Sequence, residues 1–362
     1  MSGQLPVSAT GWWRDESIMH RFVHHLLAAE MAALRPTSAC TPGSWDASLH
    51  LTRDLGVDSL ELVALASALA ETIHLHESGI EDRLLVRPTV GEWATIAQDG
   101  LEAFSSTMTF RTSGSTGNPK PCVHTLAALW QEVIELAPRF TGRTRVVSAV
   151  RSHHIYGFLF TVLLPRALDL SPSAYIDMRG RTPSSVLAEL RAGDLVIGYP
   201  DFWQVLATPA SGLPHGIVGV TSTAPCPAEV ARDLSAAGLD SLVQLYGSTE
   251  TAGVGVRSDP DESYSLFSFW ERDAVVRRMT TSELGRLKAF IVPRAGRPGD
   301  MALHTELEAW VSTRLSAPER PRAFSFGGSL PRDASGKPAD WRMEPVDRSR
   351  ALPPGPASAL IE

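Results

Sequence analysis

TFRTSGSTGNPKPCVH, residues Thr109 to His124, decides the fold and function predicted for this chain. Its glycines let the backbone approach a ligand closely, its hydroxyls can donate hydrogen bonds, and Lys120 adds a positive charge. Such a loop suits a polyphosphate. It differs from the common P-loop because no Ser or Thr follows the lysine. A strand-like TMTFR precedes the loop and a helical LAALWQEVIEL follows it, which argues against a flexible linker.

Strand-like and helix-like segments alternate after this loop. RVVSAV, DLVIGYP, GIVGVTST and SLVQLYG are short runs rich in β-branched residues, and VLAELRAG and PAEVARDLSAAG are helical segments between them. The alternation predicts an α/β core over residues 106–270, with a mostly parallel sheet. Ligand-binding loops are then expected at the carboxyl ends of the strands.

Composition limits the classes of function. A chain of 362 residues predicts two or three domains, and its net charge of −7 argues against a nucleic-acid or membrane-surface partner. No apolar run is long enough to span a bilayer. Cys40, Cys122 and Cys226 are far apart, which argues against disulfides and a cysteine-ligated metal and favours a cytoplasmic protein.

Residues 15–101, which follow a leader of residues 1–14, are predicted to be helical. Glu16 to Leu34 has the periodicity of an amphipathic helix, and Asp58 is a suitable N-cap for a second helix. Ser59 would then lie in the first turn, where its hydroxyl is exposed and the helix dipole favours an attached anion.

The phosphate loop and three later stretches resemble, in the correct order, the adenylate-forming (ANL) superfamily of acyl ligases. The later stretches are HHIYG from His153, TSTAP from Thr221, where Ser222 and Thr223 replace the usual glycines, and YGSTET from Tyr246. The resemblance implies that ATP and a carboxylic acid form an acyl-adenylate, and that a thiol then takes the acyl group.

The resemblance also implies roles for individual residues. The expected catalytic residues are Lys120, Glu250 and Lys337, with Glu250 as the Mg²⁺ ligand, since a carboxylate is a hard oxygen ligand. The expected acyl-pocket residues are His154, Tyr156 and Gly157. The expected ATP-binding residues are Thr112, Ser113, Gly114, Ser115, Thr116, Gly117, Lys120, Tyr246, Gly247 and Thr249.

The N-terminal segment resembles an acyl carrier protein in its LGVDSLEL signature and a later IEDRLLVRPTVGEW. This implies a four-helix carrier bundle with 4′-phosphopantetheine attached to Ser59. The implied partners are a phosphopantetheinyl transferase and a downstream acyltransferase or synthase. The alternative is an ordinary capped helix in which Ser59 has no chemical role.

Residues 271–342 resemble a remnant of the small α+β lid of the ANL superfamily. GRLKAFIVP is strand-like, ELEAWVSTRL is helical, and the stretch from Leu330 to Lys337 matches the final motif, which makes Lys337 the candidate catalytic lysine. Residues 343–362 are expected to be a disordered tail. The predicted protein is therefore multidomain, with a helical carrier, an α/β core and a lid remnant.

Two parts of the superfamily pattern are missing. The carrier-like segment replaces the region ahead of the phosphate loop, and Ser258 to Leu284 is too short to hold the ribose-binding aspartate and the hinge. Asp259, Asp261 and Asp273 have the wrong neighbours, and Asp300 falls within the lid remnant. The sequence therefore predicts activity that is weakened or restricted to one half-reaction.

Three functions remain open from the sequence. The chain loads an acid onto its own carrier segment, or is a carrier and scaffold whose ligase half has decayed, or is a ligase that uses free coenzyme A. The sequence does not name the acid. Trp130, Trp203, Tyr156 and Phe158 would suit a flat aromatic acid, although buried aromatic residues usually form core.

Overall fold

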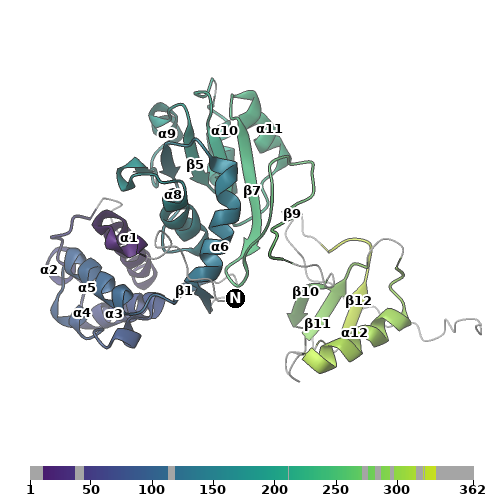
Figure 1. The fold of residues 1–362 in the computed structure, drawn as a ribbon, viewed down its shortest axis with the longest axis horizontal. Helices are drawn as coiled ribbons and strands as arrows, with labels where there is room; N and C mark the ends of the chain where they lie inside the picture. The colour runs from purple at the N-terminus through teal and green to yellow at the C-terminus, as the bar shows by residue number, and fades with distance from the viewer. Residues whose placement is uncertain are drawn as a thin grey trace, which may run out of the picture. The chain divides into compact units, whose positions relative to one another are not determined.

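The chain forms two compact units, Met1–Trp270 and Glu271–Glu362, in a computed structural model (Figure 1). The structure describes residues 11–36, 45–112, 119–210, 212–270, 276–281, 287–293, 297–314, 321 and 323–331. No helix in these ranges is both long enough and apolar enough to cross a membrane.

Where the structure describes the chain ahead of the sheet, it forms five α-helices. They are α1 (Glu16–Leu34), α2 (Leu51–Leu55), α3 (Ser59–Ile73), α4 (Arg83–Val86) and α5 (Val90–Ala103). Side chains cap the three longer helices: Asp15 accepts from Ile18 N at α1, and reciprocal capping boxes start α3 and α5. The predicted helix from Glu16 to Leu34 and the predicted N-cap Asp58 are confirmed.

These helices and the α/β part share one hydrophobic core. Trp12, within the predicted leader, is fully buried and packs edge-to-face against Phe158, with ring centroids 5.1 Å apart. Arg111 in the first strand forms ion pairs with Glu30 in α1 and Glu71 in α3. A domain boundary between residues 101 and 106 would divide this compact unit. A separate carrier domain therefore stays a prediction.

A two-stranded antiparallel hairpin surrounds the glycine-rich loop. It consists of β1 (Thr107–Arg111) and β2 (Pro121–Thr125), and α6 (Leu126–Leu136) follows at once. The Thr125 hydroxyl caps α6 by accepting from Ala128 N. The predicted strand and helix that flank the loop are both confirmed.

Seven strands form the central sheet in the order β4-β3-β5-β6-β7-β8-β9. The strands from β4 to β7 in this order are parallel, whereas β8 and β9 are antiparallel additions. All four predicted strands are present, but β4 was not predicted. The bounds are β3 (Arg145–Ser148), β4 (Tyr175–Asp177), β5 (Asp194–Gly198), β6 (Val218–Thr221), β7 (Ser241–Ser248), β8 (Ala252–Arg257) and β9 (Ser265–Leu266).

Helices cover both faces of this sheet, which explains why every residue of β5 and β6 is buried. Leu195 and Ile197 face the core that contains α6, and Val196 faces a second core formed with α9, α10 and α11. The remaining helices of this unit are α7 (Ile155–Phe158), a π-helical segment Leu159–Leu163, α8 (Leu164–Ala167), α9 (Pro183–Glu189), α10 (Pro200–Ala207) and α11 (Ala228–Ala236).

The described part of the first unit also contains four short 3₁₀ turns. They are Trp12–Arg14, Leu75–Ser78, Ala137–Phe140 and Pro172–Ala174.

The second unit contains β10 (Val276–Thr281), β11 (Leu287–Ile291), α12 (Met301–Arg314) and β12 (Ala323–Phe326). The strands pair in the order β10-β11-β12, and Leu303, Leu307 and Val311 of α12 contribute to its small core. The predicted strand and helix of the lid remnant correspond to β11 and α12. Lys337 and the tail lie outside the described residues.

Candidate functional site

A pocket of about 1020 Å³ opens at the carboxyl ends of the parallel strands. Its lining includes residues that directly follow β3, β4, β5 and β6, and residues at the end of β7. This is the position expected for ligand loops in an α/β sheet. The pocket therefore lies where the sequence analysis expects ligand-binding loops, and the roles of its residues stay predictions.

Many predicted site residues meet in this pocket. Ser113, Gly114, Ser115, Thr116, Gly117 and Lys337 lie outside the described residues, and Ser59 does not line the pocket. The predicted residues that line it are Thr112, Lys120, His154, Tyr156, Gly157, Tyr246, Gly247, Thr249 and Glu250.

The base of the glycine-rich loop is closed by two hydrogen bonds between Thr112 and Lys120. Thr112 N donates to Lys120 O over 3.0 Å, and Lys120 N donates to Thr112 Oγ1 over 2.9 Å. The Lys120 side chain is exposed at the pocket. It is therefore free to reach a bound anion, as a compact and flexible ammonium can.

The end of β7 provides the opposite arm of the site. Glu250 is exposed, and the Tyr246 ring is 60% exposed, so both can meet a ligand. His124 Nε2 donates to Thr249 O over 2.7 Å and so ties this arm to β2. The residues that the sequence assigned to phosphate and to metal thus belong to two elements that a hydrogen bond holds together.

Glu132 lines the pocket and was not predicted from the sequence. Its side chain is buried, and Gly253 N donates to its carboxylate over 2.8 Å. Burial raises the pKa of Glu132 to about 7. The available signal was a glutamate on the same helical face as Leu129, Val133 and Leu136, an unusual place for a carboxyl group.

Thr223, also in the pocket wall, has a left-handed backbone with φ of 79°. A β-branched residue rarely adopts this conformation, which favours glycine. Thr223 stands where the ANL pattern has glycine, and its positive φ gives that replacement a steric cost. The preceding Ser222 donates from its hydroxyl to Leu245 O over 3.3 Å.

The three predicted acyl-pocket residues contribute to the structure in different ways. Gly157 is required sterically, because a Cβ there would lie 1.8 Å from Arg151 O. The buried Tyr156 hydroxyl lies 2.9 Å from Gly198 O and 3.1 Å from Val220 O, so it supports the ends of β5 and β6. His154 lines the pocket and is exposed to it. Desolvation by the neighbouring protein, followed by the charge of Arg151, lowers its pKa to about 4.

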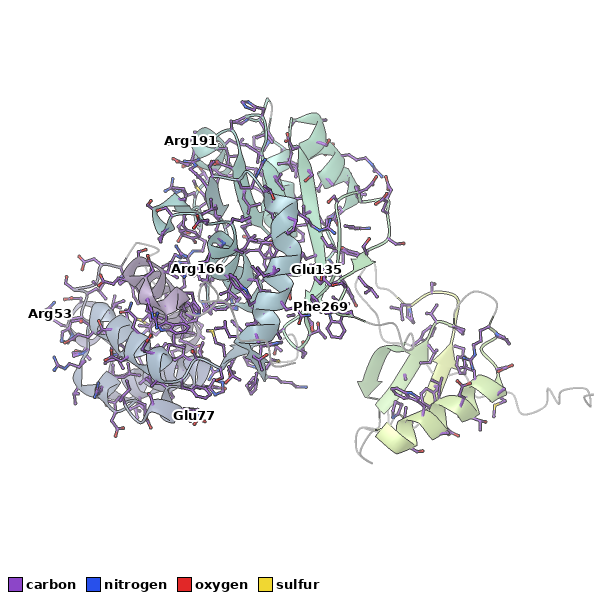
Figure 2. The ribbon with its side chains drawn as sticks, viewed as in Figure 1. Arg53, Glu77, Glu135, Arg166, Arg191 and Phe269 are labelled. Atoms are coloured by element: carbon purple, nitrogen blue, oxygen red, sulfur yellow. The ribbon has the colours of Figure 1, made fainter. Side chains whose placement is uncertain are left out.

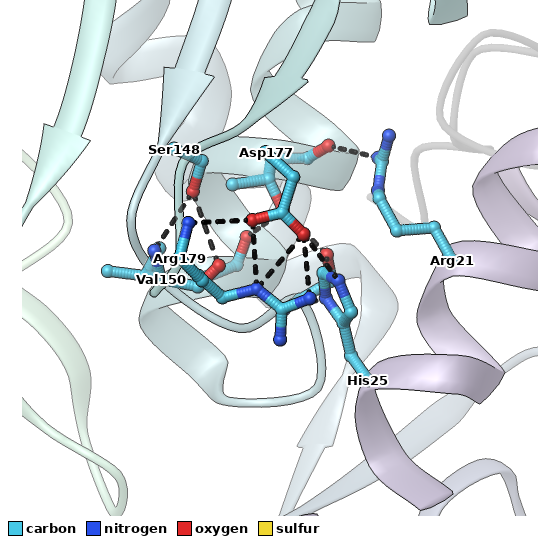
Figure 3. A network of polar contacts seen from close by, with 9 residues as sticks. Arg21, His25, Ser148, Val150, Asp177 and Arg179 are labelled. Carbon is cyan, nitrogen blue, oxygen red and sulfur yellow. Dashed lines mark hydrogen bonds and ion pairs between the residues drawn. The ribbon is translucent and has the colours of Figure 1, made fainter. Parts of the chain in front are cut away.

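A polar network links α1 to the loop ends of β3 and β4 (Figure 3). His25 Nδ1 accepts from Ser152 N over 3.0 Å, which leaves Nε2 to donate to Asp177 over 3.3 Å. Burial, foremost, lowers the pKa of His25 to about 3, so the ring is neutral near pH 7. Arg179, a pocket residue, binds the same Asp177 carboxylate, with Nη2 to Oδ2 at 2.6 Å.

Glu250 fits the requirements of Mg²⁺, because this ion keeps several waters and commonly uses one or two carboxylates together with substrate phosphates. In the described ranges no three His, Cys, Asp or Glu residues gather in a way that would hold a metal without a substrate.

Of the aspartates considered for the ribose, Asp259 and Asp261 are in the described part of the first unit, and neither lines this pocket. Asp261 pairs with Arg232 over 2.9 Å, and Asp259 accepts from Asp261 N. Asp300 accepts from Leu303 N at the start of α12, and Asp273 lies outside the described residues.

Residues 107–268 match a family model described as AMP-binding enzyme. A 4-coumarate–CoA ligase of Halorhodospira halophila is 32% identical over 385 residues, which cover 88% of this chain and 97% of that protein. A 4-coumarate–CoA ligase of Cereibacter sphaeroides is 34% identical over 348 residues, which cover 79% and 84%. Residues 107–362 make up less than three quarters of the chain, whereas each match covers more than three quarters of it. Both matches therefore include part of the N-terminal helices.

The solved structure of ATP-bound MatB from Rhodopseudomonas palustris covers 87% of this chain and 90% of that one. Its identity to this chain is 14% and its TM-score is 0.38. The two 4-coumarate–CoA ligases are more similar in sequence, and their matches cover most of both chains. The chain belongs to the AMP-binding enzyme family and is an adenylate-forming acid–thiol ligase of the acyl-CoA ligase type.

Proposed function

We propose that the pocket binds ATP with Mg²⁺ and a carboxylic acid, and that the chain converts the acid to a thioester of coenzyme A. The observation that carries this proposal is the convergence of Thr112, Lys120, Thr249 and Glu250 on one large pocket. The names of the curated relatives support an aromatic acid of the 4-coumarate type.

In the first half-reaction a carboxylate oxygen of the acid attacks the α-phosphorus of ATP, and the bond to pyrophosphate breaks. The Lys120 ammonium and the Thr112 and Thr249 hydroxyls bind phosphate oxygens on which negative charge develops. Glu250 holds Mg²⁺, and this ion supplies charge neutralisation at the phosphates when it is bound. Lys337 assists adenylation, as its position in the final motif implies.

In the second half-reaction the sulfur of a thiolate attacks the acyl carbon, and AMP leaves. His154 and Gly157 flank the acyl group in this proposal, while Tyr156 holds the strand ends that form the wall. His154 stays neutral near pH 7, since its pKa is about 4, and so adds no charge beside the acyl group.

A second candidate acceptor is 4′-phosphopantetheine on Ser59. The exposed position of Ser59 in the first turn of α3 favours it, and the neighbouring Leu60 is 81% exposed. A phosphopantetheinyl transferase would then be a partner, as would a downstream acyltransferase or synthase. We rank this candidate second because the curated coenzyme A ligases match the same N-terminal helices, which also share a core with the α/β part.

We also propose that an internal block is missing, so that one half-reaction is slow. The match to the Halorhodospira halophila ligase is 385 residues long, but it includes only 88% of this 362-residue chain. Some residues of that ligase therefore have no counterpart here. That difference supports a shortened segment between Ser258 and Leu284. In this proposal the missing block includes the ribose-binding aspartate, so nucleotide affinity falls while the residues that line the pocket still bind the phosphates.

ATP–pyrophosphate exchange over a panel of aromatic and aliphatic acids tests the adenylation step. Exchange with at least one acid is expected, and silence over the panel would contradict the proposal. Ser59→Ala then separates the two acceptors. Formation of the coenzyme A thioester should survive this substitution, whereas loss of all thioester formation would favour the carrier.

A further inference from the structure

Three arginines line the pocket at one edge of the sheet. Arg151 follows β3, and Arg179 and Arg181 follow β4. The sequence motifs gave none of them a role. Arg151 and Arg179 are close enough to interact, because the charge of Arg179 contributes to the lowered pKa of Arg151.

The carboxylate beside this cluster is already occupied. Asp177 accepts from Arg179 Nε and Nη2 and from His25 Nε2, as Figure 3 shows. Within the described residues neither Arg151 nor Arg181 forms an ion pair or a side-chain hydrogen bond. The cluster therefore presents positive charge to the pocket, and no carboxylate among the described residues pairs with Arg151 or Arg181 to balance it.

Arg151 is exposed at the pocket, where a bound anion can reach it. Desolvation by the surrounding protein is the largest cause of the lowered pKa of its guanidinium, and the charge of Arg179 lowers that pKa further. An arginine kept in a pocket without a counter-charge is suited to a carboxylate or phosphate, which its planar fork binds through two parallel hydrogen bonds.

The cluster lies away from the nucleotide arm. Strand β3 is three places from β7 in the sheet, or about 14 Å at the usual spacing between strands. Tyr199 and Phe202, which follow the intervening β5, also line the pocket. The pocket thus has the proposed phosphate-binding residues at the end of β7, aromatic residues after β5, and arginines after β3 and β4.

We propose that Arg151 and Arg181 bind a second anionic group on the acid, so that the preferred substrate is an elongated aromatic dicarboxylic acid or a similar dianion. This inference rests on the proposed function. A phosphate group of coenzyme A has the same chemistry, and the experiment below separates the two sources. Arg179 contributes less because Asp177 already holds its guanidinium.

Exchange of ATP with pyrophosphate involves no coenzyme A and so isolates the acid. The matched probes are 4-carboxycinnamate and cinnamate, which differ by one carboxylate. We expect kcat/KM to favour 4-carboxycinnamate by about tenfold or more, as for a charge-assisted bidentate contact. Arg151→Gln and Arg181→Gln should each reduce this preference by most of that factor.

Arg191→Gln is the matched control. Arg191 is exposed and precedes β5, at the opposite end of the strands from the pocket (Figure 2). It should leave the preference unchanged. Equal use of both acids by the wild-type protein, or a preference that survives Arg151→Gln, would overturn the inference.

If Arg151→Gln raises only the KM for coenzyme A, the anion is a coenzyme A phosphate and the assignment to the acid is wrong. Calorimetric titration with 4-carboxycinnamate in the presence of MgATP separates this inference from the proposed function. Binding that weakens in Arg151→Gln would support the inference even without exchange. No binding, together with exchange on other acids, would overturn the inference and leave the proposed function intact.

Discussion

His124 Nε2 lies 2.7 Å from the backbone oxygen of Thr249 and joins the strand after the glycine-rich loop to the end of β7. Both arms carry residues assigned to the nucleotide. A displacement of either arm would therefore separate Lys120 from Glu250, and His124 is a positioning residue in this account.

His124→Ala should weaken the binding of MgATP by about fivefold, since a hydrogen bond of this kind contributes about 1 kcal/mol. His124→Gln should recover part of the affinity, because its amide can donate to the same oxygen. Val123→Ala is the control, as Val123 is 60% exposed on the same strand. Calorimetric dissociation constants check this prediction, and equal values for His124→Ala and wild type would contradict it.

The fold was largely predictable because β5, β6 and β7 are short apolar runs and the helices between them have helical periodicity. Strand β4 was missed since Tyr175–Asp177 is only three residues long and half-buried. The role of Trp12 was also missed. No local pattern indicates that a tryptophan near the N-terminus packs against Phe158, 146 positions further along the chain.

The candidate site was predictable where motifs determine residue types, as at Lys120 and Glu250. Glu132, His25 and Arg151 were missed because their environments arise from contacts between distant segments. His25, for example, meets Ser152 and Asp177 only after α1 packs on the sheet. Burial and charge balance are properties of the folded chain, and sequence spacing does not reveal them.

Glu132→Gln should change how stability depends on pH. The pKa of Glu132 is about 7 in the folded protein and about 4.5 in the unfolded chain, so the unfolded chain loses this proton first. Stability from this group is complete below pH 4.5 and is lost as pH rises through 7, by about 3 kcal/mol in all. The Gln variant should lack this decline while its amide oxygen still accepts from Gly253 N.

Urea unfolding at pH 5, 6, 7 and 8 measures the effect. Glu229→Gln, on the exposed side of α11, removes a carboxylate without this burial and serves as the control. Identical slopes of unfolding free energy against pH for wild type and Glu132→Gln would show that Glu132 is ionised normally.

His25→Ala should lower the free energy of unfolding by about 3 kcal/mol, because it leaves a cavity and removes the partners of Ser152 and Asp177. The folded pKa of His25 is about 3 and the ordinary value 6.5, so the unfolded chain binds this proton first as pH falls. The wild type should therefore lose stability from pH 6.5 downward, and the variant should lose less over that range.

Thermal and urea unfolding at pH 7 and 5 check both parts of this prediction. His76→Ala, at an exposed position in the same N-terminal helices, is the control and should change stability little. Unchanged stability of His25→Ala would mean that α1 does not depend on the network in Figure 3.

Calorimetric titration with MgATP in the absence of any acid tests the central claim most directly, because it requires no knowledge of the substrate. We predict binding in the micromolar range that weakens by about tenfold or more in Lys120→Ala and in Glu250→Ala, each of which removes a charged contact. Glu229→Ala should bind as wild type does. No detectable binding by the folded protein, or equal binding by wild type and both pocket variants, would contradict the account.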